Sequence, residues 1–140
     1  MQPTAESRKI TRNFARVIGP YIAIVTAIII FKAHDMGAYL AGTFANPVIP
    51  WMLGAMLLFF ALVIIAFHQY WNGPAAVMIS LLGWFLGIRG LILLAAPQLI
   101  ERGGEAAVAP DKVLWMRIGF FSLTLIGLYL TYSGWIKKSE

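Results

Sequence analysis

The stretch between Asp35 and Arg89 contains no acidic residue, no lysine and no arginine. Two long apolar runs fill most of it, and the turn Asn72-Gly73-Pro74 separates them. A helix cannot continue through this turn, because glycine is flexible and proline lacks a backbone N–H group. The stretch therefore predicts a hairpin of two membrane-spanning segments with the turn at its tip.

The rest of the chain shares this apolar character. Of its 140 residues, 60% are hydrophobic and 12% are charged, whereas soluble domains carry about 25% charged residues. In a bilayer every backbone polar group must be satisfied internally, which leaves helices or a closed barrel. Barrel strands alternate in polarity over about ten residues, but the apolar runs here are continuous, as in residues 52–67. We therefore predict an all-α membrane protein, an antiparallel four-helix transmembrane bundle with short loops.

We expect a single membrane domain over residues 1–140, with spans at residues 17–33, 48–68, 74–96 and 113–135. Pro20 would lie in the first turn of the first span, where its missing donor costs little. The basic segment 1–16 precedes this span. Its apolar residues Ile10 and Phe14 are four apart, and Val17 follows at a spacing of three, which predicts a short amphipathic helix on the membrane surface.

Two connections are expected to be loops. Residues 34–50 contain several glycines and prolines, which break helices, and we interpret them as an interfacial loop. The polar residues from Glu101 to Lys112 predict a second loop.

An even number of spans places both termini on the same side of the membrane. Lysine and arginine residues are more numerous on the cytoplasmic side. Six lie on the side of the termini and four on the opposite side, which predicts a multi-pass protein of the bacterial cytoplasmic (inner) membrane with both termini cytoplasmic. The six are Arg8, Lys9, Arg12, Arg16, Lys137 and Lys138, and the four are Lys32, Arg102, Lys112 and Arg117.

Three glycines lie on one face of the third span. Gly83, Gly87 and Gly90 stand at positions i, i+4 and i+7, and small residues at this spacing let helix backbones approach closely in a membrane. The face predicts either packing within the bundle or contact with another subunit. Trp84 is expected to fill the groove beside Gly83.

Arg89 is a charge far from the ends of its span, about 10 Å from the outer end. A charged residue inside a membrane is by default a candidate functional residue. With Arg117, His34 and Lys32 it would line a cationic vestibule for an anion or a lipid phosphate. The alternative is that Arg89 reaches outward to phosphate or pairs with Asp35 or Glu101.

Cofactor and catalytic chemistry have no candidate residues. The chain has no cysteine, and His34 and His68 lie at opposite ends of their spans, about 30 Å apart, so they cannot hold one haem. We expect no metal, no cofactor and no enzymatic activity. The net charge of +5 comes from basic residues that flank the spans, so orientation in the membrane explains it without nucleic acid.

The middle of the chain resembles a group of small four-span bacterial inner-membrane proteins of unknown function. The resemblance rests on His68, Tyr70-Trp71, Pro74, Ser80, Gly83-Trp84, Arg89-Gly90 and Pro97. In that group the basic position is often lysine, so Arg89 departs from the pattern. The resemblance implies a four-span fold and no particular activity.

These observations lead to two functional hypotheses. The first is a non-enzymatic accessory or structural subunit that lies in the lipid bilayer and binds itself or a larger membrane complex. The second is an oligomeric pore or a transport protein for an anion or small solute. Spans almost free of polar residues favour the first, because a water-filled path needs a polar lining.

Overall fold

A computed structural model describes residues 4–137, and within them the chain is almost entirely helical, with no strand. The all-α fold predicted from the sequence is confirmed. Four helices are long and apolar enough to cross a membrane: α1 (Ala5–Phe31), α3 (Val48–Phe67), α4 (Pro74–Ala95) and α6 (Val113–Thr131) with the π-helical turn η2 (Tyr132–Ile136) that continues it. The remaining elements are the 3-10 turn η1 (Ala33–Asp35), α2 (Met36–Ala45) and α5 (Pro97–Ala107).

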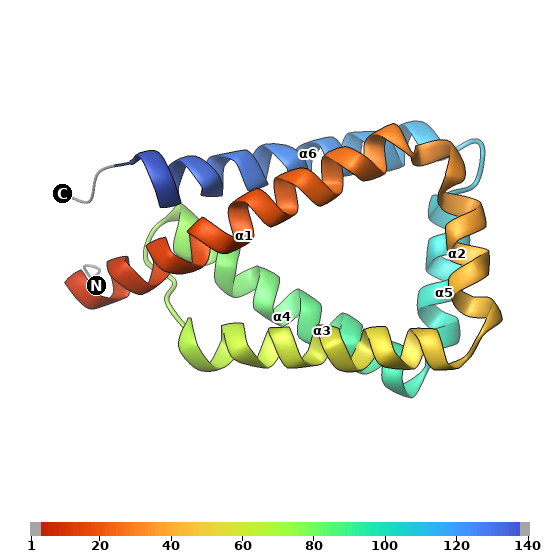
Figure 1. Cartoon of the computed structure of the whole chain (residues 1–140), viewed down its shortest axis with the longest axis horizontal. Coiled ribbons are helices and arrows are strands. Elements are labelled where there is room, and N and C mark those ends of the chain that lie inside the picture. Colours follow the sequence, from red (N-terminus) through yellow and green to blue (C-terminus); the bar gives the residue numbers. More distant parts are fainter. Residues whose placement is uncertain (1–3, 138–140) are drawn as a thin grey trace.

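The four long helices form two antiparallel pairs (Figure 1). One pair is α1 with α6, the first and last helices of the chain, and the other is the α3–α4 hairpin. The beginning of α1, the end of η2 and the turn of residues 68–73 lie at one end of the molecule, which we call the terminal end. Helices α2 and α5 lie across the opposite end, which we call the far end.

Both connections predicted as loops contain helices, so the expectation of short loops is wrong there. Gly37 and Gly42 lie inside α2, where each costs only about 1 kcal/mol relative to alanine. The helix ends just before Pro47, as expected of a residue that precedes proline. In α5, Pro97 occupies the first turn, where its missing N–H group has no helical partner to lose.

Helix α1 also differs from its prediction, because the basic segment is not a separate surface helix. Residues 5–16 continue without a break into the span; residues 1–3 and Lys138 lie outside the described residues. Pro20 is consequently inside the helix rather than in its first turn, and the carbonyl of Arg16 loses its usual donor. The indole N–H group of Trp135 donates to this carbonyl at 3.1 Å and replaces the missing bond.

Within each pair, glycines allow the backbones to approach closely. A Cβ atom on Gly134 would lie 2.7 Å from the backbone nitrogen of Arg16, and one on Gly127 would lie 2.9 Å from the Cα atom of Ala23. In the α3–α4 hairpin, a Cβ atom on Gly90 would lie 2.9 Å from the carbonyl oxygen of Gly54. Close backbone approach is a main source of helix association where lipid removes the hydrophobic effect.

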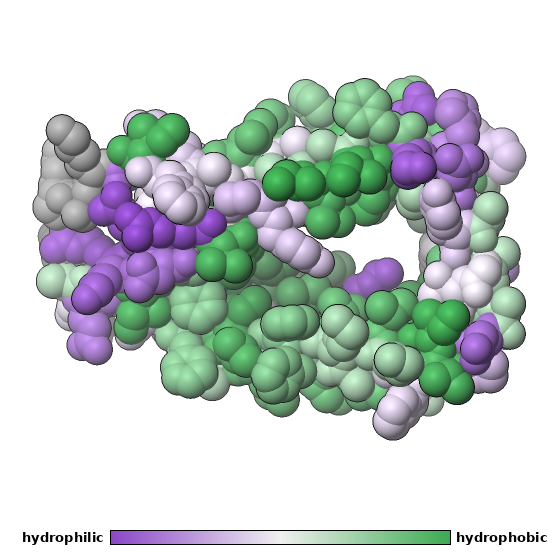
Figure 2. Space-filling model, in the orientation of Figure 1, coloured by the Kyte–Doolittle hydropathy of each residue, from purple (hydrophilic) through white to green (hydrophobic). Residues whose placement is uncertain are grey.

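The two pairs meet mainly at the terminal end. There a buried cluster combines residues of all four long helices: Ala15, Ile64, Ala75, Ile79 and Leu130. Toward the far end the pairs separate, and Figure 2 shows an opening between them that α2 and α5 close off at the far end. The protein therefore has one core shared by all four long helices, and the two helix pairs diverge from it toward the far end.

Candidate functional sites

The glycine face of α4 contacts α3 of the same chain. Cβ atoms on Gly83 and Gly90 would lie 2.6 Å from Ile64 and 2.7 Å from the nitrogen of Leu58, respectively. Gly87 faces the same helix. Of the two alternatives left open by the sequence, the structure shows packing within the chain.

Trp84 does not fill the groove beside Gly83, so that expectation is wrong. Its side chain is 49% exposed, and Ile64 lies against Gly83 instead. Trp84 follows Gly83 directly, and successive helical residues point about 100° apart, so a tryptophan there is turned away from the helix that the glycine faces.

Three of the four candidate cationic residues gather at the far end. Arg117 of α6 donates through Nη2 to Nε2 of His34 at 3.2 Å, which links α6 to η1. Lys32 lies beside Tyr39, with its Nζ atom 3.4 Å from the phenolic oxygen. The Nε atom of Arg117 is buried without a hydrogen-bond partner among residues 4–137.

Arg89 is separate from these three residues. Within the described part of the chain its side chain has no hydrogen bond and no ion pair, so the pairing with Asp35 or Glu101 that the sequence allowed does not form. Arg89 lies about three helical turns beyond Met78, so both share one face of α4. Met78 packs on the buried cluster where the two pairs meet. Arg89 is exposed, and because the pairs separate past that point we infer that it is directed toward the opening.

His68 forms a buried site that sequence reasoning missed. The imidazole is fully buried at the terminal end, where Nε2 lies 3.0 Å from Oγ1 of Thr11 and Nδ1 lies 3.1 Å from Oγ of Ser80. The rings of Phe14 and Tyr70 meet it edge-on, each with its centroid 5.4 Å away. His68 therefore joins α1 to the hairpin.

The hydrogen bonds determine which imidazole nitrogen carries the proton. Ser80 has one hydroxyl hydrogen, which it donates to the carbonyl of Tyr70 at 2.8 Å. The Ser80 oxygen must then accept a hydrogen bond from the N–H group at Nδ1 of His68. The unprotonated Nε2 atom accepts a hydrogen bond from the hydroxyl of Thr11. Burial lowers the pKa of His68 below its ordinary value of 6.5, because the charged form loses its hydration.

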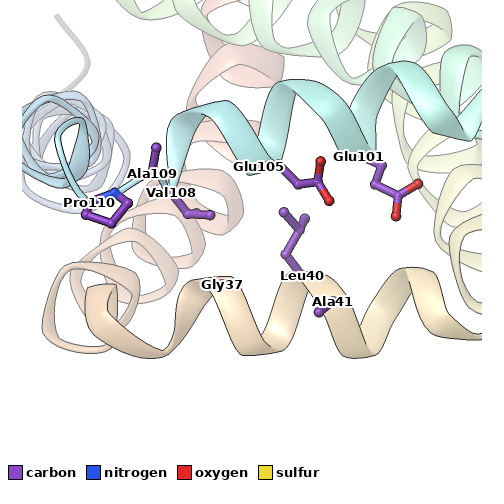
Figure 3. Close-up of a pocket in the computed structure, with 8 residues that line it drawn as sticks. All are labelled: Gly37, Leu40, Ala41, Glu101, Glu105, Val108, Ala109 and Pro110. Carbon is purple, nitrogen blue, oxygen red and sulfur yellow. The ribbon is translucent and has the colours of Figure 1, made fainter.

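A cavity of about 290 Å³ lies between α2 and α5 (Figure 3). Leu40 of α2 points toward α5 and packs against Gly104, where a Cβ atom would lie 2.9 Å from it. Two carboxylates one turn apart on α5, Glu101 and Glu105, border the cavity beside this leucine. This contact holds together α2 and α5, which lie side by side at the far end and each run from one helix pair to the other.

The small residues that pack α1 against α6 were also missed, although the sequence carries a signal for them. Ala15, Gly19 and Ala23 recur at a spacing of four and are all buried in α1. Gly127 and Gly134 are seven residues apart on the facing helix. Small residues at these spacings are typical of helix contacts in membranes, and the pattern would have identified the pair.

Comparison with protein-family models, curated proteins and solved structures finds no match. No group of three or more metal-ligating side chains is found within residues 4–137. Chemically, the described residues offer a cation at Arg89 that forms no hydrogen bond or ion pair among them, within the candidate membrane-spanning helix α4, and hydrogen-bonding clusters at the two ends of the molecule.

Proposed function

We propose that the chain is a non-enzymatic accessory or structural subunit of a membrane complex, formed with further copies of itself or with a larger assembly. The observation that carries this proposal is Arg89, a charge inside a span that faces the opening and has no partner within residues 4–137. Charged residues in membranes almost always pair with another group. No acidic residue falls within positions 7–31, 48–67, 74–95 or 113–136, and Glu6 lies in the first turn of α1. The counter-charge is then a carboxylate on a transmembrane helix of another subunit, which enters the opening.

The proposal places the protein in a bacterial cytoplasmic membrane with cytoplasmic termini. The beginning of α1 and the end of η2 both lie at the terminal end, which supports an even number of membrane crossings. The larger number of basic residues at that end supports the orientation. Reporter domains fused after Ser139 should be active in the cytoplasm, and those inserted at Gly103 should be active in the periplasm. The reverse pattern would refute the orientation.

Arg89→Leu tests the role of the cation. An arginine at a helix centre costs about 2.5–3.5 kcal/mol to insert, and less nearer the end of a span. Removing the charge of Arg89 relieves part of this cost, so the variant should fold and insert at least as well as the parent. It should nevertheless lose its partner during gentle solubilisation, as measured by native mass spectrometry. Arg89→Lys should retain the partner in part, because it keeps the charge but not the two-donor geometry.

Arg102→Leu is the matched control, since Arg102 is an exposed arginine outside the spans, in α5. It should leave the complex intact. If Arg89→Leu retains the same partners as the parent and the control, Arg89 does not mediate assembly and the proposal fails.

The second candidate is an oligomeric pore or transport protein for an anion or small solute. The opening itself, with Arg89 directed toward it, favours this candidate. An anion-selective conductance of the purified protein in a planar bilayer, abolished by Arg89→Leu, would replace the subunit hypothesis with this one.

A further inference from the structure

His34 and Arg117 meet at the far end, where η1 lies against the first turns of α6. The Nη2 atom of Arg117 lies 3.2 Å from Nε2 of His34. A guanidinium can only donate hydrogen bonds, so Nε2 of His34 must accept and therefore carries no proton. A protonated imidazole is a donor at both nitrogens. This hydrogen bond therefore exists only while His34 is neutral.

Arg117 lies on the face of α6 that contacts α1. It stands seven residues before Thr124, which places both residues on the same face of the helix. The Oγ1 atom of Thr124 lies 2.7 Å from Oγ1 of Thr26 in α1. The Nε atom of Arg117 is buried with no hydrogen-bond partner among residues 4–137. The imidazole of His34 is thus the group that anchors this guanidinium within the described part of the chain.

A proton on His34 would convert this contact into a repulsive one. Within residues 4–137, no carboxylate forms an ion pair with His34 or with Arg117. Two cations would then face each other across 3.2 Å with no hydrogen bond between them, and like charges at this range repel. The charged and titratable groups of η1 and of the elements packed against it, with the turn before α6, are Lys32, Asp35, Tyr39, Asp111, Lys112 and Arg117.

The contact lies where the two helices of the far end are attached to the α1–α6 pair. The turn η1 leads into α2, and α5 leads through residues 108–112 into α6 (Figure 1). A hydrogen bond between η1 and α6 therefore fixes the beginning of α2 relative to the end of α5. Since α2 and α5 close off the opening at the far end, the loss of this bond loosens that closure on the side of α6.

We infer that His34 and Arg117 form a proton-sensitive latch that holds α6 against η1 while His34 is neutral and releases it in acid. Histidine ordinarily changes its charge between about pH 5 and about pH 8. His34 is exposed, so its proton shifts a local equilibrium, whereas the buried His68 governs the pH dependence of global unfolding. The latch goes beyond the proposed assembly function and does not depend on it. In the orientation proposed above, it responds to acid on the periplasmic side.

The test measures the distance between α2 and α6 in the full chain. The chain has no cysteine, so Ala38→Cys and Leu114→Cys supply two exposed sites for spin labels. Electron paramagnetic resonance gives the distance between the labels in phosphatidylcholine nanodiscs at about pH 7.5 and about pH 5.5, which bracket the ordinary titration of histidine. Carboxylates ordinarily stay ionised at both values, because their reference pKa values are about 4.

We expect a second, longer distance to appear at the lower pH. Because one proton opens the latch, the ratio of open to closed molecules should change by at most about tenfold per pH unit. His34→Gln keeps an oxygen that accepts from Arg117 but cannot be protonated, so its distance should be the same at both pH values. Arg117→Gln removes the second cation and should also abolish the pH dependence, which tests the latch even if His34→Gln does not fold.

His68→Gln is the matched control, because it removes the other histidine of the chain. Its labels should separate in acid as they do in the parent. A separation that persists in His34→Gln, or that disappears in His68→Gln, would overturn the inference. An unchanged distance in the parent between the two pH values would overturn it as well.

Discussion

Ser80→Ala should destabilise the fold far more than the loss of one hydroxyl normally does. The Ser80 hydroxyl accepts a hydrogen bond from Nδ1 of His68 and donates one to the carbonyl of Tyr70. Its removal therefore leaves the buried Nδ1–H donor and the partly buried carbonyl without hydrogen-bond partners. By contrast, Thr11→Val keeps the shape of its side chain and strands only the lone pair on Nε2 of His68.

The expected cost follows from these partners. A buried polar group left without a hydrogen bond costs about 1–3 kcal/mol. We therefore expect a loss of about 2–4 kcal/mol in unfolding free energy for Ser80→Ala and about 1–2 kcal/mol for Thr11→Val. In the first variant His68 can move its proton to Nε2 and donate to Thr11, which keeps the loss toward the lower value. Since both changes act on one imidazole, the double variant should lose less than the sum.

Unfolding by SDS in mixed micelles, followed by tryptophan fluorescence, measures these differences. Ser122→Ala is the matched control, because the Ser122 hydroxyl is exposed and bonds only to the carbonyl one turn earlier in its own helix. Its effect should be within about 0.5 kcal/mol of zero. A Ser80→Ala effect as small as that of the control would refute the inferred hydrogen-bonding of His68.

Three further outcomes are expected in the same assay. The free energy of unfolding should be constant above pH 6.5 and should fall as the pH drops from there toward the lowered pKa of folded His68. In this range the unfolded chain binds a proton on the histidine that the folded chain does not bind. The variant His68→Gln should remove this pH dependence. Gly90→Ala should cost about 1–3 kcal/mol, since its methyl group would meet the backbone of α3. Trp135→Phe should lower the free energy of unfolding by about 1 kcal/mol, because the carbonyl of Arg16 loses its hydrogen-bond donor. Adding Pro20→Ala should recover this stability, because residue 20 then supplies the helical N–H donor.

Matched controls separate these effects from general ones. A Cβ atom on Gly119 would meet no atom within 4 Å, so Gly119→Ala should stabilise the helix rather than cost free energy. Trp115→Phe changes an exposed indole and should have little effect. If either control matches its test variant, the proposed contact does not explain the loss.

The sequence predicted the long helices well because their signal is local. A span needs only a continuous run of apolar residues, and the turn at Asn72-Gly73-Pro74 marks where two of them separate. The helix α5 was missed because Gly103 and Gly104 interrupt a polar segment, which resembles a loop when read alone. Its helical form depends partly on contact between Gly104 and Leu40 of α2, which is distant in sequence.

The sites were harder to predict, because they depend on which helices become neighbours. No local pattern connects His68 with its partner Thr11, because 57 residues separate them. Gly83, Gly87 and Gly90 were recognised as a contact face, but their spacing alone cannot distinguish a partner in the same chain from one in another. The role of Trp135 depends on Pro20, at the other end of the chain, and no local pattern connects them.

The pairing of α1 with α6 has a consequence for biosynthesis. Helix α1 leaves the ribosome well before its partner α6, whereas the α3–α4 hairpin pairs soon after it is made. Ala15, Gly19 and Ala23 must therefore face lipid or the insertion machinery until Gly127 and Gly134 have been translated. A nascent chain that stops before α6 would contain a complete hairpin and an unpartnered first helix, so truncation should expose the protein to quality-control proteases more than its length suggests.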